Sequence, residues 1–335
     1  MRAFHIERFD DIDGLKVREH DVGEPGRNEV LVRVHAASLN YRDLLILNRG
    51  YPVPGHEGVI PLSDGAGEVI AVGAGVRRVG IGDRVCSTYF LGHIDGPLTL
   101  AAVGPQLGAT VDGMLAEYRV LHEDWVVRIA DHLSYLEGST LPCAAVTAWS
   151  GIHGEHGLVG PDDTVLVVGT GGVALFAVQF AGALGARVVG VTSSAEKARL
   201  LNDIGATDVV DPTSTPDWHA EVLRLTGGVS HVVETIGPST LEQSIRSLGL
   251  GGFLALIGVY PTEPGSFDPN VFAGRMFTMR RIAVGSRADL EALNELMAEH
   301  ELHPVLDRTF DFADAPAAYA HMQGRRHLGK IVISI

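Results

Sequence analysis

The chain contains very little cysteine. Two residues, Cys86 and Cys143, occur among 335. Two thiols cannot form a disulfide framework, nor can they supply the four cysteines of an all-thiolate zinc site. A secretory signal is also missing at the start, since residues 1–14 mix charged and apolar side chains and contain no apolar core. We therefore expect a cytoplasmic protein that folds in a reducing compartment.

Basic residues are scarce relative to acidic ones. Lys and Arg together number 26 and Asp and Glu 41, which gives a formal net charge of -15 at pH 7. An acidic surface repels phosphate backbones and anionic lipids. The composition therefore argues against nucleic acid or a membrane as the main partner.

An uninterrupted apolar segment is missing as well, although residues 164–186 carry no charge and are numerous enough to cross a bilayer. Glycines interrupt this stretch, Gln179 lies inside it, and charges flank it closely without a positive bias on one side. We interpret the stretch as a buried strand followed by a buried helix.

Glycine, by contrast, is abundant, at 41 residues or about 12% of the chain against a usual ~7%. Residues 1–147 show short strand patterns separated by Gly and Pro, as where Val30, Val32 and Val34 alternate with polar residues. This pattern predicts a small β-rich barrel or roll. Residues 91–113 lack periodicity and are predicted to be a long lobe or loop.

The pattern changes near residue 160. Apolar runs at 165–168, 187–191 and 231–233 alternate with helical segments of about ten residues. Strands that are apolar on both faces and alternate with helices predict a parallel sheet covered on both sides, so this half is expected to be a doubly wound α/β domain. A strand is also expected near 281–284. The last 45 residues show two helical stretches and a closing strand at 330–335.

A glycine-rich loop connects the first strand of this half to its first helix. The sequence from Gly169 to Ala174 fits G-x-G-x-x-A, with a buried strand before it and an apolar helix after it. The first glycine allows a tight turn, the second lets the backbone approach a pyrophosphate, and the helix N-terminus favours phosphate. An ordinary glycine turn is the alternative. The predicted dinucleotide-binding residues are Gly169, Thr170, Gly171, Gly172 and Val173.

The end of the second strand bears on which dinucleotide binds. An NAD site needs an acidic residue there for the ribose hydroxyls, but the sequence offers Thr192, Ser193, Ser194 and then Lys197. Hydroxyls and an ammonium suit a 2′-phosphate, so NADP is the predicted cofactor. Glu196 is expected to turn back and cap the helix together with Ser193.

Taken together, the motifs resemble those of the medium-chain dehydrogenase/reductase superfamily, in particular its zinc-free quinone oxidoreductase-like branch. The resemblance runs essentially end to end. It implies an α/β protein with a GroES-like β-rich catalytic domain (1–147), a Rossmann doubly wound NADP-binding domain (148–286) and a C-terminal segment (287–335) that returns to the catalytic domain. The motifs that carry it are residues 40–43, 62–69, 82–85, 113–118, 141–149 and the glycine loop.

The same resemblance implies that no metal is bound. Where the zinc branch has its three ligands, this chain has Asn40, Ser63 followed by Asp64, and Cys143, so one ligand of three remains. His56 belongs to a Gly-His-Glu tripeptide that resembles a zinc motif but lies too early. A rearranged site made of His56, Asp64 and Cys143 stays open as an alternative.

The resemblance implies an NADPH-dependent, zinc-independent oxidoreductase that reduces quinones or α,β-unsaturated carbonyl compounds, with a small-molecule substrate. Tyr41 is expected to be a proton donor or an orienting hydroxyl, or else an aromatic wall. Lys330 is expected to reach the cofactor or the substrate region, and Cys143 to be a buried filler. Asn40 and Thr147 are expected to line the nicotinamide site, and the residues expected to close around the nicotinamide are Ile257, Val259, Ser286 and Arg287.

Two other functions stay open at this point. One is a zinc-type NAD(P)-dependent alcohol dehydrogenase, and the other is a non-enzymatic NADPH-binding protein. A homodimer is also expected, formed by pairing of the edge of the parallel sheet near residues 281–284.

Overall fold

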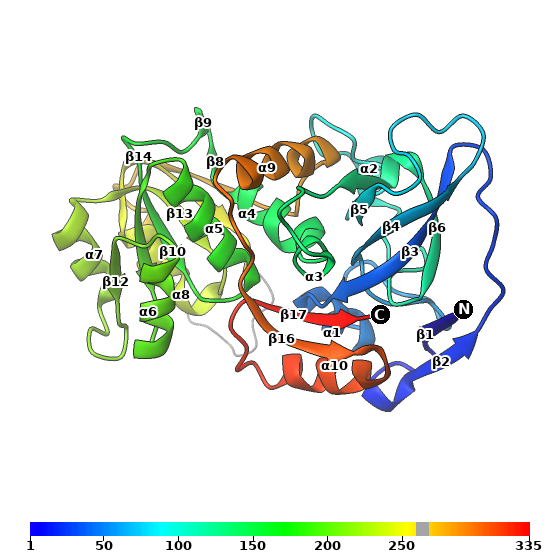
Figure 1. Ribbon diagram of the computed structural model, residues 1–335. Helices are drawn as coiled ribbons and strands as arrows, with labels where there is room; N and C mark the ends of the chain where they lie inside the picture. Colours follow the sequence, from blue (N-terminus) through cyan, green and yellow to red (C-terminus); the bar gives the residue numbers. More distant parts are fainter. Residues whose placement is uncertain (259–267) are drawn as a thin grey trace. The chain divides into compact units, whose positions relative to one another are not determined.

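The computed structural model describes residues 1–258 and 268–335 (Figure 1). They form two compact units. Unit 1 contains residues 1–146 and 285–335, and unit 2 contains residues 147–284. The domain boundaries expected from the sequence, after residues 147 and 286, lie one and two residues from these divisions.

Unit 1 is built around an open sheet with the strand order β16-β17-β3-β4-β5-β7 in the described part of the chain, and β6 also pairs with β3. A separate hairpin joins β1 and β2. The strands are β1 (Arg2–Ile6), β2 (Leu15–Glu19), β3 (Glu29–Ser38), β4 (Asp64–Val72), β5 (Arg84–Ser87), β6 (Tyr118–His122), β7 (Val126–Arg128), β16 (Leu306–Asp311) and β17 (Lys330–Ser334). The helices are α1 (Tyr41–Leu47), α2 (Leu100–Val103), α3 (Tyr135–Gly138), α9 (Arg287–Glu299) and α10 (Ala315–Gln323).

The central strand β3 follows the alternation seen in the sequence. Val30, Val32 and Val34 are buried, and Arg33 is exposed. On the far side of β3 from β4, the C-terminal strand β17 pairs antiparallel with it. The Leu39 N–H also donates to the Ile331 carbonyl at 3.0 Å. The end of the chain is thereby held beside the segment that follows β3.

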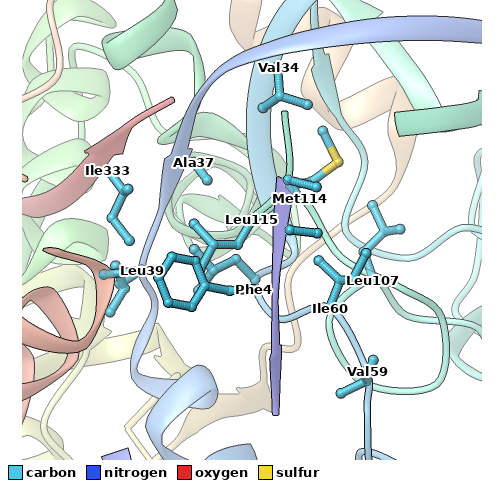
Figure 2. Packing of buried hydrophobic residues seen from close by; sticks show 14 of the residues in the cluster. Phe4, Val34, Ala37, Leu39, Val59, Ile60, Leu107, Met114, Leu115 and Ile333 are labelled. Carbon is cyan, nitrogen blue, oxygen red and sulfur yellow. The ribbon is translucent and has the colours of Figure 1, made fainter. Parts of the chain in front are cut away.

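Apolar side chains from distant parts of the sequence form the core of unit 1. Figure 2 shows Phe4 of β1, Leu39 after β3, Leu115 before β6 and Ile333 of β17 gathered in this cluster. Burial of such side chains stabilises the fold by roughly 1.5–3 kcal/mol each. The core therefore ties the C-terminal strand to the N-terminal hairpin.

Unit 2 is a parallel sheet with the described strands in the order β12-β11-β10-β13-β14-β15. This is the 3-2-1-4-5-6 order of a Rossmann domain, with its topological switch between β10 and β13. The strands are β10 (Thr164–Val168), β11 (Arg187–Val191), β12 (Asp208–Val210), β13 (Val229–Glu234), β14 (Leu248–Leu256) and β15 (Phe277–Arg281), and a small hairpin joins β8 (His153–Gly154) to β9 (Gly157–Leu158). The helices are α4 (Val146–Gly151, beginning at the boundary), α5 (Gly172–Ala183), α6 (Ala195–Asp203), α7 (Trp218–Thr226) and α8 (Pro238–Arg246). The predicted doubly wound α/β fold is confirmed.

The uncharged stretch 164–186 is a buried strand followed by a buried helix, as predicted. β10 and α5 lie within it, and most of their residues are buried. Within the described ranges, no helix has both the length and the apolar character needed to cross a membrane.

Two sequence-based expectations for the strands were wrong. The last strand of the parallel sheet ends at Arg281 instead of running over 281–284, because Val284 has a φ of 55°, which an extended strand cannot contain. Strand β16 was not predicted. Its sequence, LDRTFD, has one buried residue, Phe310, and therefore no apolar alternation.

Candidate functional site

The glycine loop of unit 2 uses its first and second glycines differently. Gly169 has a φ of 113°, and a Cβ there would lie 2.6 Å from the Thr235 hydroxyl oxygen. That hydroxyl donates to the Val168 carbonyl at 2.6 Å. Gly171 precedes α5 with an ordinary φ of -78°, and a Cβ there would meet no described atom within 4 Å. The fold itself requires Gly169, whereas Gly171 leaves open space at the N-terminus of α5.

The turn after β11 contains the residues expected to select the cofactor. Thr192 is buried, and its N–H donates to the Val210 carbonyl at 3.1 Å, while Ser193 is exposed. Ser194, not Ser193 with Glu196, is the N-cap of α6. Its hydroxyl accepts from the Lys197 N–H at 3.5 Å. The expected cap was wrong by one residue because the helix begins at Ala195, one position later than expected.

Two side chains of this turn remain available for a ligand. Ser193 and Lys197 make no hydrogen bond or ion pair from their side chains to other residues within 1–258 and 268–335. Since β11 ends at Val191, no carboxylate follows directly at the strand end. The position therefore offers a hydroxyl and an ammonium group, with no carboxylate directly after the strand.

A buried carboxylate organises the loop that follows β13. Glu234 accepts hydrogen bonds on Oε1 from the N–H groups of Ile236 at 2.8 Å and Gly237 at 2.9 Å, and from the Thr240 hydroxyl at 2.9 Å. Its Oε2 accepts from the Ser244 hydroxyl. Burial raises the pKa of Glu234, against the effect of these donors. The sequence analysis missed this residue, although a carboxylate ending an apolar strand was a visible signal.

Glu234 also connects this loop to the end of β14. The N–H groups of Ile257 and Gly258 donate to the Glu234 carbonyl at 2.9 and 3.0 Å. Gly237, with a φ of 117°, packs against Gly258 so closely that a Cβ would lie 2.4 Å from the Gly258 carbonyl oxygen. Ile257 is therefore placed at the carboxyl edge of the sheet, where dinucleotides bind in this fold. Val259 lies outside the described residues.

In unit 1, the sequence-predicted residues Asn40 and Lys330 lie in contact. The Lys330 ammonium donates to the Leu39 carbonyl at 2.7 Å and to Asn40 Oδ1 at 2.6 Å. Both side chains are buried, with 8% of Asn40 and 3% of Lys330 exposed. The Asn40 N–H donates to Asp43 Oδ2 at 2.8 Å, which fixes the start of α1. Burial lowers the pKa of Lys330, and the negative charges of Asp64 and Asp43 oppose that shift.

Asp64 and Cys143 lie near Lys330, and together with Asn40 and Lys330 they form the polar cluster of unit 1. The Ser63 hydroxyl donates to Asp64 Oδ1 at 2.6 Å, and the Cys143 N–H donates to Asp64 Oδ2 at 3.1 Å. Burial raises the pKa of the Cys143 thiol, and the charge of Asp64 raises it further. In the absence of a bound cation the thiol is therefore protonated at neutral pH.

A buried arginine adjoins this cluster and was missed by the sequence analysis. Arg42 donates from Nη1 to the Leu107 carbonyl at 3.1 Å and to Asp43 Oδ1 at 3.4 Å. Its guanidinium lies 4.8 Å from the ring centroid of Tyr89 and 5.3 Å from that of Tyr51, and the two tyrosine hydroxyls are 2.7 Å apart. Burial raises the pKa of Asp43 to about 6, although Arg42 opposes the shift. The sequence analysis included Arg42 in the motif of residues 40–43 but assigned no role to it.

Tyr41 and Thr147 lie in different units. Tyr41 is 37% exposed, its hydroxyl accepts from Arg325 at 2.8 Å, and its ring centroid lies 5.5 Å from that guanidinium. Thr147 is buried at the start of unit 2. Their expected roles stay predictions.

Ser286 and Arg287 have structural partners within unit 1. The Ser286 hydroxyl caps α9, accepting from the Asp289 N–H at 3.0 Å. Arg287 donates from Nη1 to Asp124, and its Nε lies 3.5 Å from Glu291. The polar groups of both side chains therefore have partners within unit 1. Their contact with the nicotinamide, expected from the resemblance, stays a prediction.

Comparison with known proteins places the chain in a family. The family described as "Alcohol dehydrogenase GroES-like domain" matches residues 26–131, and the family described as "Zinc-binding dehydrogenase" matches residues 172–299. A zinc-type alcohol dehydrogenase-like protein of Schizosaccharomyces pombe is 39% identical over 100% of this chain and 99% of its own length. The chain belongs to the medium-chain dehydrogenase/reductase superfamily, and unit 1 contains its GroES-like domain.

Relatives in this superfamily differ in their named activities. Acryloyl-coenzyme A reductase of Metallosphaera sedula is 30% identical, with 96% of each chain covered, and quinone oxidoreductase of Pseudomonas aeruginosa is 30% identical, with 95% of each covered. A solved NAD-dependent alcohol dehydrogenase matches with a TM-score of 0.90 at 30% identity over 100% of both chains. A mycobacterial protein complexed with NADPH matches with a TM-score of 0.81 at 26% identity over 100% of both. The chain is therefore an oxidoreductase of this superfamily, and the NADPH complex of that neighbour agrees with a nicotinamide cofactor.

The zinc in one family's description can be tested against the donors of unit 1. Among the residues that the structure describes, no three His, Cys, Asp or Glu side chains lie close enough together to hold a metal ion. His56 is exposed, and its imidazole contacts the Glu57 carbonyl at 3.2 Å, so the rearranged site of His56, Asp64 and Cys143 does not form there. The oxygens of Asp64 and Asn40 are bonded to protein donors. The described donor set does not fit zinc.

Proposed function

We propose that the protein is an NADPH-dependent, zinc-independent oxidoreductase that reduces quinones or α,β-unsaturated carbonyl compounds. The observation that carries the proposal is the contact between Lys330 and Asn40. An ammonium group donates to the one oxygen atom that the Asn40 side chain could offer a metal. Acceptors with conjugated double bonds need less activation of their oxygen than simple ketones do, because the charge that develops after hydride addition is delocalised.

The cofactor part of the proposal depends on unit 2. When bound, a reduced nicotinamide supplies the hydride. Gly171 and the N-terminus of α5 would face the pyrophosphate, since that backbone is open and the helix dipole favours negative charge. Ser193 and Lys197 would bind the 2′-phosphate, which favours NADP over NAD.

The polar cluster of unit 1 would bind and orient the acceptor. Asn40 carries donors toward a carbonyl oxygen, while Arg42 and Asp43 hold α1 in place through buried contacts. The protonated Cys143 thiol is too weak a nucleophile for covalent catalysis. The protein therefore contributes orientation and a hydrogen-bonding environment, and the chemistry resides in the cofactor.

The test is to follow the absorbance of the reduced cofactor at about 340 nm. NADPH and NADH are each offered with panels of quinones, enones, simple ketones and primary alcohols, and the metal content of the same preparation is measured. We expect turnover of quinones or enones with NADPH by metal-free protein. Alcohol oxidation that requires stoichiometric zinc would contradict the proposal.

The second candidate is a zinc-type alcohol dehydrogenase, which the names of two relatives favour. The metal measurement separates the two, because that enzyme loses activity on chelation and recovers it with zinc. A non-enzymatic NADPH-binding role would instead show cofactor binding without turnover of any compound in the panels.

We also propose that the protein is a homodimer that pairs through β15. This strand lies at the end of the described sheet, so one of its edges has no partner strand among the described residues. Large apolar side chains are exposed beside it, with exposed fractions of 72% for Met276, 41% for Met279 and 87% for Leu250. Light scattering tests the proposal, and a monomer at micromolar concentration would contradict it.

A further inference from the structure

The orientation of the Asn40 side-chain amide is fixed by its neighbour. An amide can present either its oxygen or its NH₂ group to a partner, and the choice follows from the hydrogen bonds around it. The Lys330 ammonium has donors and no acceptor. Since Nζ lies 2.6 Å from the amide, the oxygen Oδ1 must face Lys330, and the NH₂ group must face away.

Both partners in this contact are themselves held in place. Lys330 has a second acceptor, the Leu39 carbonyl at 2.7 Å, and it belongs to β17, which pairs with β3. Asn40 is held by its backbone N–H on Asp43 Oδ2. The direction of the Asn40 NH₂ group is therefore fixed by two contacts, one to the first residue of β17 and one to the first turn of α1.

The Asn40 NH₂ group itself lacks a partner. Its Nδ2 is buried and finds no hydrogen-bond acceptor among residues 1–258 and 268–335, although the side chain is about nine-tenths buried. A buried donor without an acceptor destabilises a fold. A donor that is kept unpaired and is also aimed by a buried lysine is suited to an acceptor that arrives with a ligand.

We propose that Asn40 Nδ2 donates to the carbonyl oxygen of an α,β-unsaturated carbonyl substrate, and that Lys330 is the positioning residue that aims it. This inference rests on the proposed function. In the reaction, a hydride moves with its electron pair from the reduced nicotinamide to the β-carbon. The carbon–carbon π electrons shift to form an enolate, and its oxygen takes the negative charge. A solvent proton then adds to the α-carbon, and the cofactor leaves oxidised.

A donor at the carbonyl oxygen accelerates this step because the oxygen gains charge in the transition state. The hydrogen bond is then stronger in the transition state than in the bound substrate. Lys330 adds nothing directly to this bond. Its effect passes through Asn40, because without the ammonium the amide is free to rotate and present its oxygen to the substrate, which repels the enolate.

The first test replaces the donor and keeps its surroundings. Asn40→Asp retains the size of the side chain, can pair with Lys330, and has no N–H to donate at neutral pH. We expect kcat for an enone to fall about 100-fold, as when one oxyanion donor is removed, with the dissociation constant of NADPH unchanged within about twofold. In Asn40→Ala, kcat for the enone should fall by a similar factor. An unchanged kcat in both variants would overturn the proposal.

The second test asks whether Lys330 acts through Asn40. Lys330→Met should lower kcat for the enone, and the double variant Lys330→Met/Asn40→Ala should be no slower than Asn40→Ala alone. If the fold losses in kcat of the two single variants multiply in the double variant, Lys330 contacts the ligand itself, and its positioning role is overturned. Thermal unfolding and NADPH titration of each variant confirm that it is folded, and Asn40→Asp decides the role of Asn40 if Lys330→Met does not fold.

A third test separates the substrate from a competing acceptor, the carboxamide oxygen of the nicotinamide. If that oxygen is the acceptor, Asn40→Ala would weaken binding of the cofactor alone and leave the affinity for a saturated ketone unchanged. Titrating that ketone into the complex with oxidised cofactor, followed by protein fluorescence, measures its affinity without turnover. Equal ketone affinities in wild type and Asn40→Ala would overturn the inference, whereas wild-type protein that reduces no enone or quinone would contradict the proposed function.

Discussion

The two units satisfy buried charges in different ways. In unit 2, the partners of Glu234 lie two to ten residues further along the chain, and two of them are backbone N–H groups. In unit 1, Lys330 is 290 residues from Asn40, and the Cys143 N–H is 79 residues from Asp64. Unit 2 therefore builds its candidate site from local turns, while unit 1 builds its own by bringing remote segments together.

This difference has consequences for stability. A local network can form as soon as its loop forms, and it tolerates changes elsewhere. A cluster assembled from remote segments depends on the packing of β17 against β3, and its charges of opposite sign depend on one another. The predictions below ask whether removing one member costs more in unit 1 than in unit 2.

Removing the cation of unit 1 should have the largest effect. Lys330→Met leaves Asp64 and Asp43 buried near a neutral side chain, and we expect a loss of about 3 kcal/mol in the free energy of unfolding at pH 7. Urea unfolding measures it. A loss below about 0.5 kcal/mol, the usual range for surface substitutions, would show that the cluster does not depend on its lysine.

The loss caused by Lys330→Met should also depend on pH. Burial lowers the pKa of Lys330 from its ordinary 10.5, so between the lowered pKa and 10.5 the unfolded chain binds the proton more often than the folded protein. Wild-type stability from this group therefore rises with pH across that window, and the Met variant lacks this rise. The difference between the two proteins should grow toward pH 10, in parallel urea titrations.

The next prediction concerns the glycine loop of unit 2. Gly169→Ala should reduce stability by about 2 kcal/mol, because a φ of 113° strains an alanine and its Cβ would press on the Thr235 hydroxyl. Gly171→Ala is the matched control, since its φ is ordinary and no described atom lies near the added methyl. It should unfold within about 0.5 kcal/mol of wild type, as neutral substitutions do.

The same pair of variants separates folding from cofactor binding. Gly171→Ala should weaken NADPH binding at least tenfold, or about 1.4 kcal/mol, because the methyl blocks close approach of the pyrophosphate to the backbone. Fluorescence titration with NADPH measures this. Wild-type affinity in Gly171→Ala would mean that the phosphates do not approach this part of the loop.

A smaller loss of stability is expected at Glu234, where the partners are local. Glu234→Gln keeps the size and one acceptor oxygen, so we expect a loss of about 1 kcal/mol at pH 7. Burial raises the pKa of Glu234 above its ordinary 4.5, so the folded protein keeps this proton up to a higher pH than the unfolded chain does. The contribution of Glu234 to wild-type stability therefore falls as pH rises from 4.5 to the folded pKa. The Gln variant should lack that fall in urea unfolding between pH 4 and 7, and a parallel dependence in both proteins would contradict it.

The contrast between the units also explains what the sequence could predict. The glycine loop and the turn after β11 are continuous in the chain, so spacing and residue type were enough to locate the loop of Gly169 and Gly171 and the helix start that contains Lys197. The roles of these residues in cofactor binding stay predictions. Errors there were small, such as the cap at Ser194 in place of Ser193. Local hydrogen bonds determine the exact residue at which a helix begins, and residue types alone do not predict which of two adjacent serines accepts them.

The cluster of unit 1 was harder to predict. Asn40 and Lys330 were singled out by resemblance, but their contact depends on β17 pairing with β3, which no local pattern reveals. Arg42 was missed because a charged residue in a helix is usually exposed, and its burial between two tyrosines follows from tertiary packing. The prediction of this cluster was limited because its contacts join residues that are far apart in the sequence.

The smallest expected effect concerns Lys197. It tests whether the sequence pattern after β11 predicts the preference for NADPH over NADH. Lys197 is partly exposed and makes no side-chain hydrogen bond or ion pair within the described ranges, so Lys197→Ala should leave stability unchanged. It should weaken NADPH binding about fivefold, or about 1 kcal/mol as for an exposed ion pair, while NADH binding stays the same. Arg199→Ala, an exposed cation two residues further along α6, is the matched control and should change neither. Equal losses for both cofactors would mean that Lys197 attracts them only through general charge, and high salt would then abolish the difference between wild type and variant.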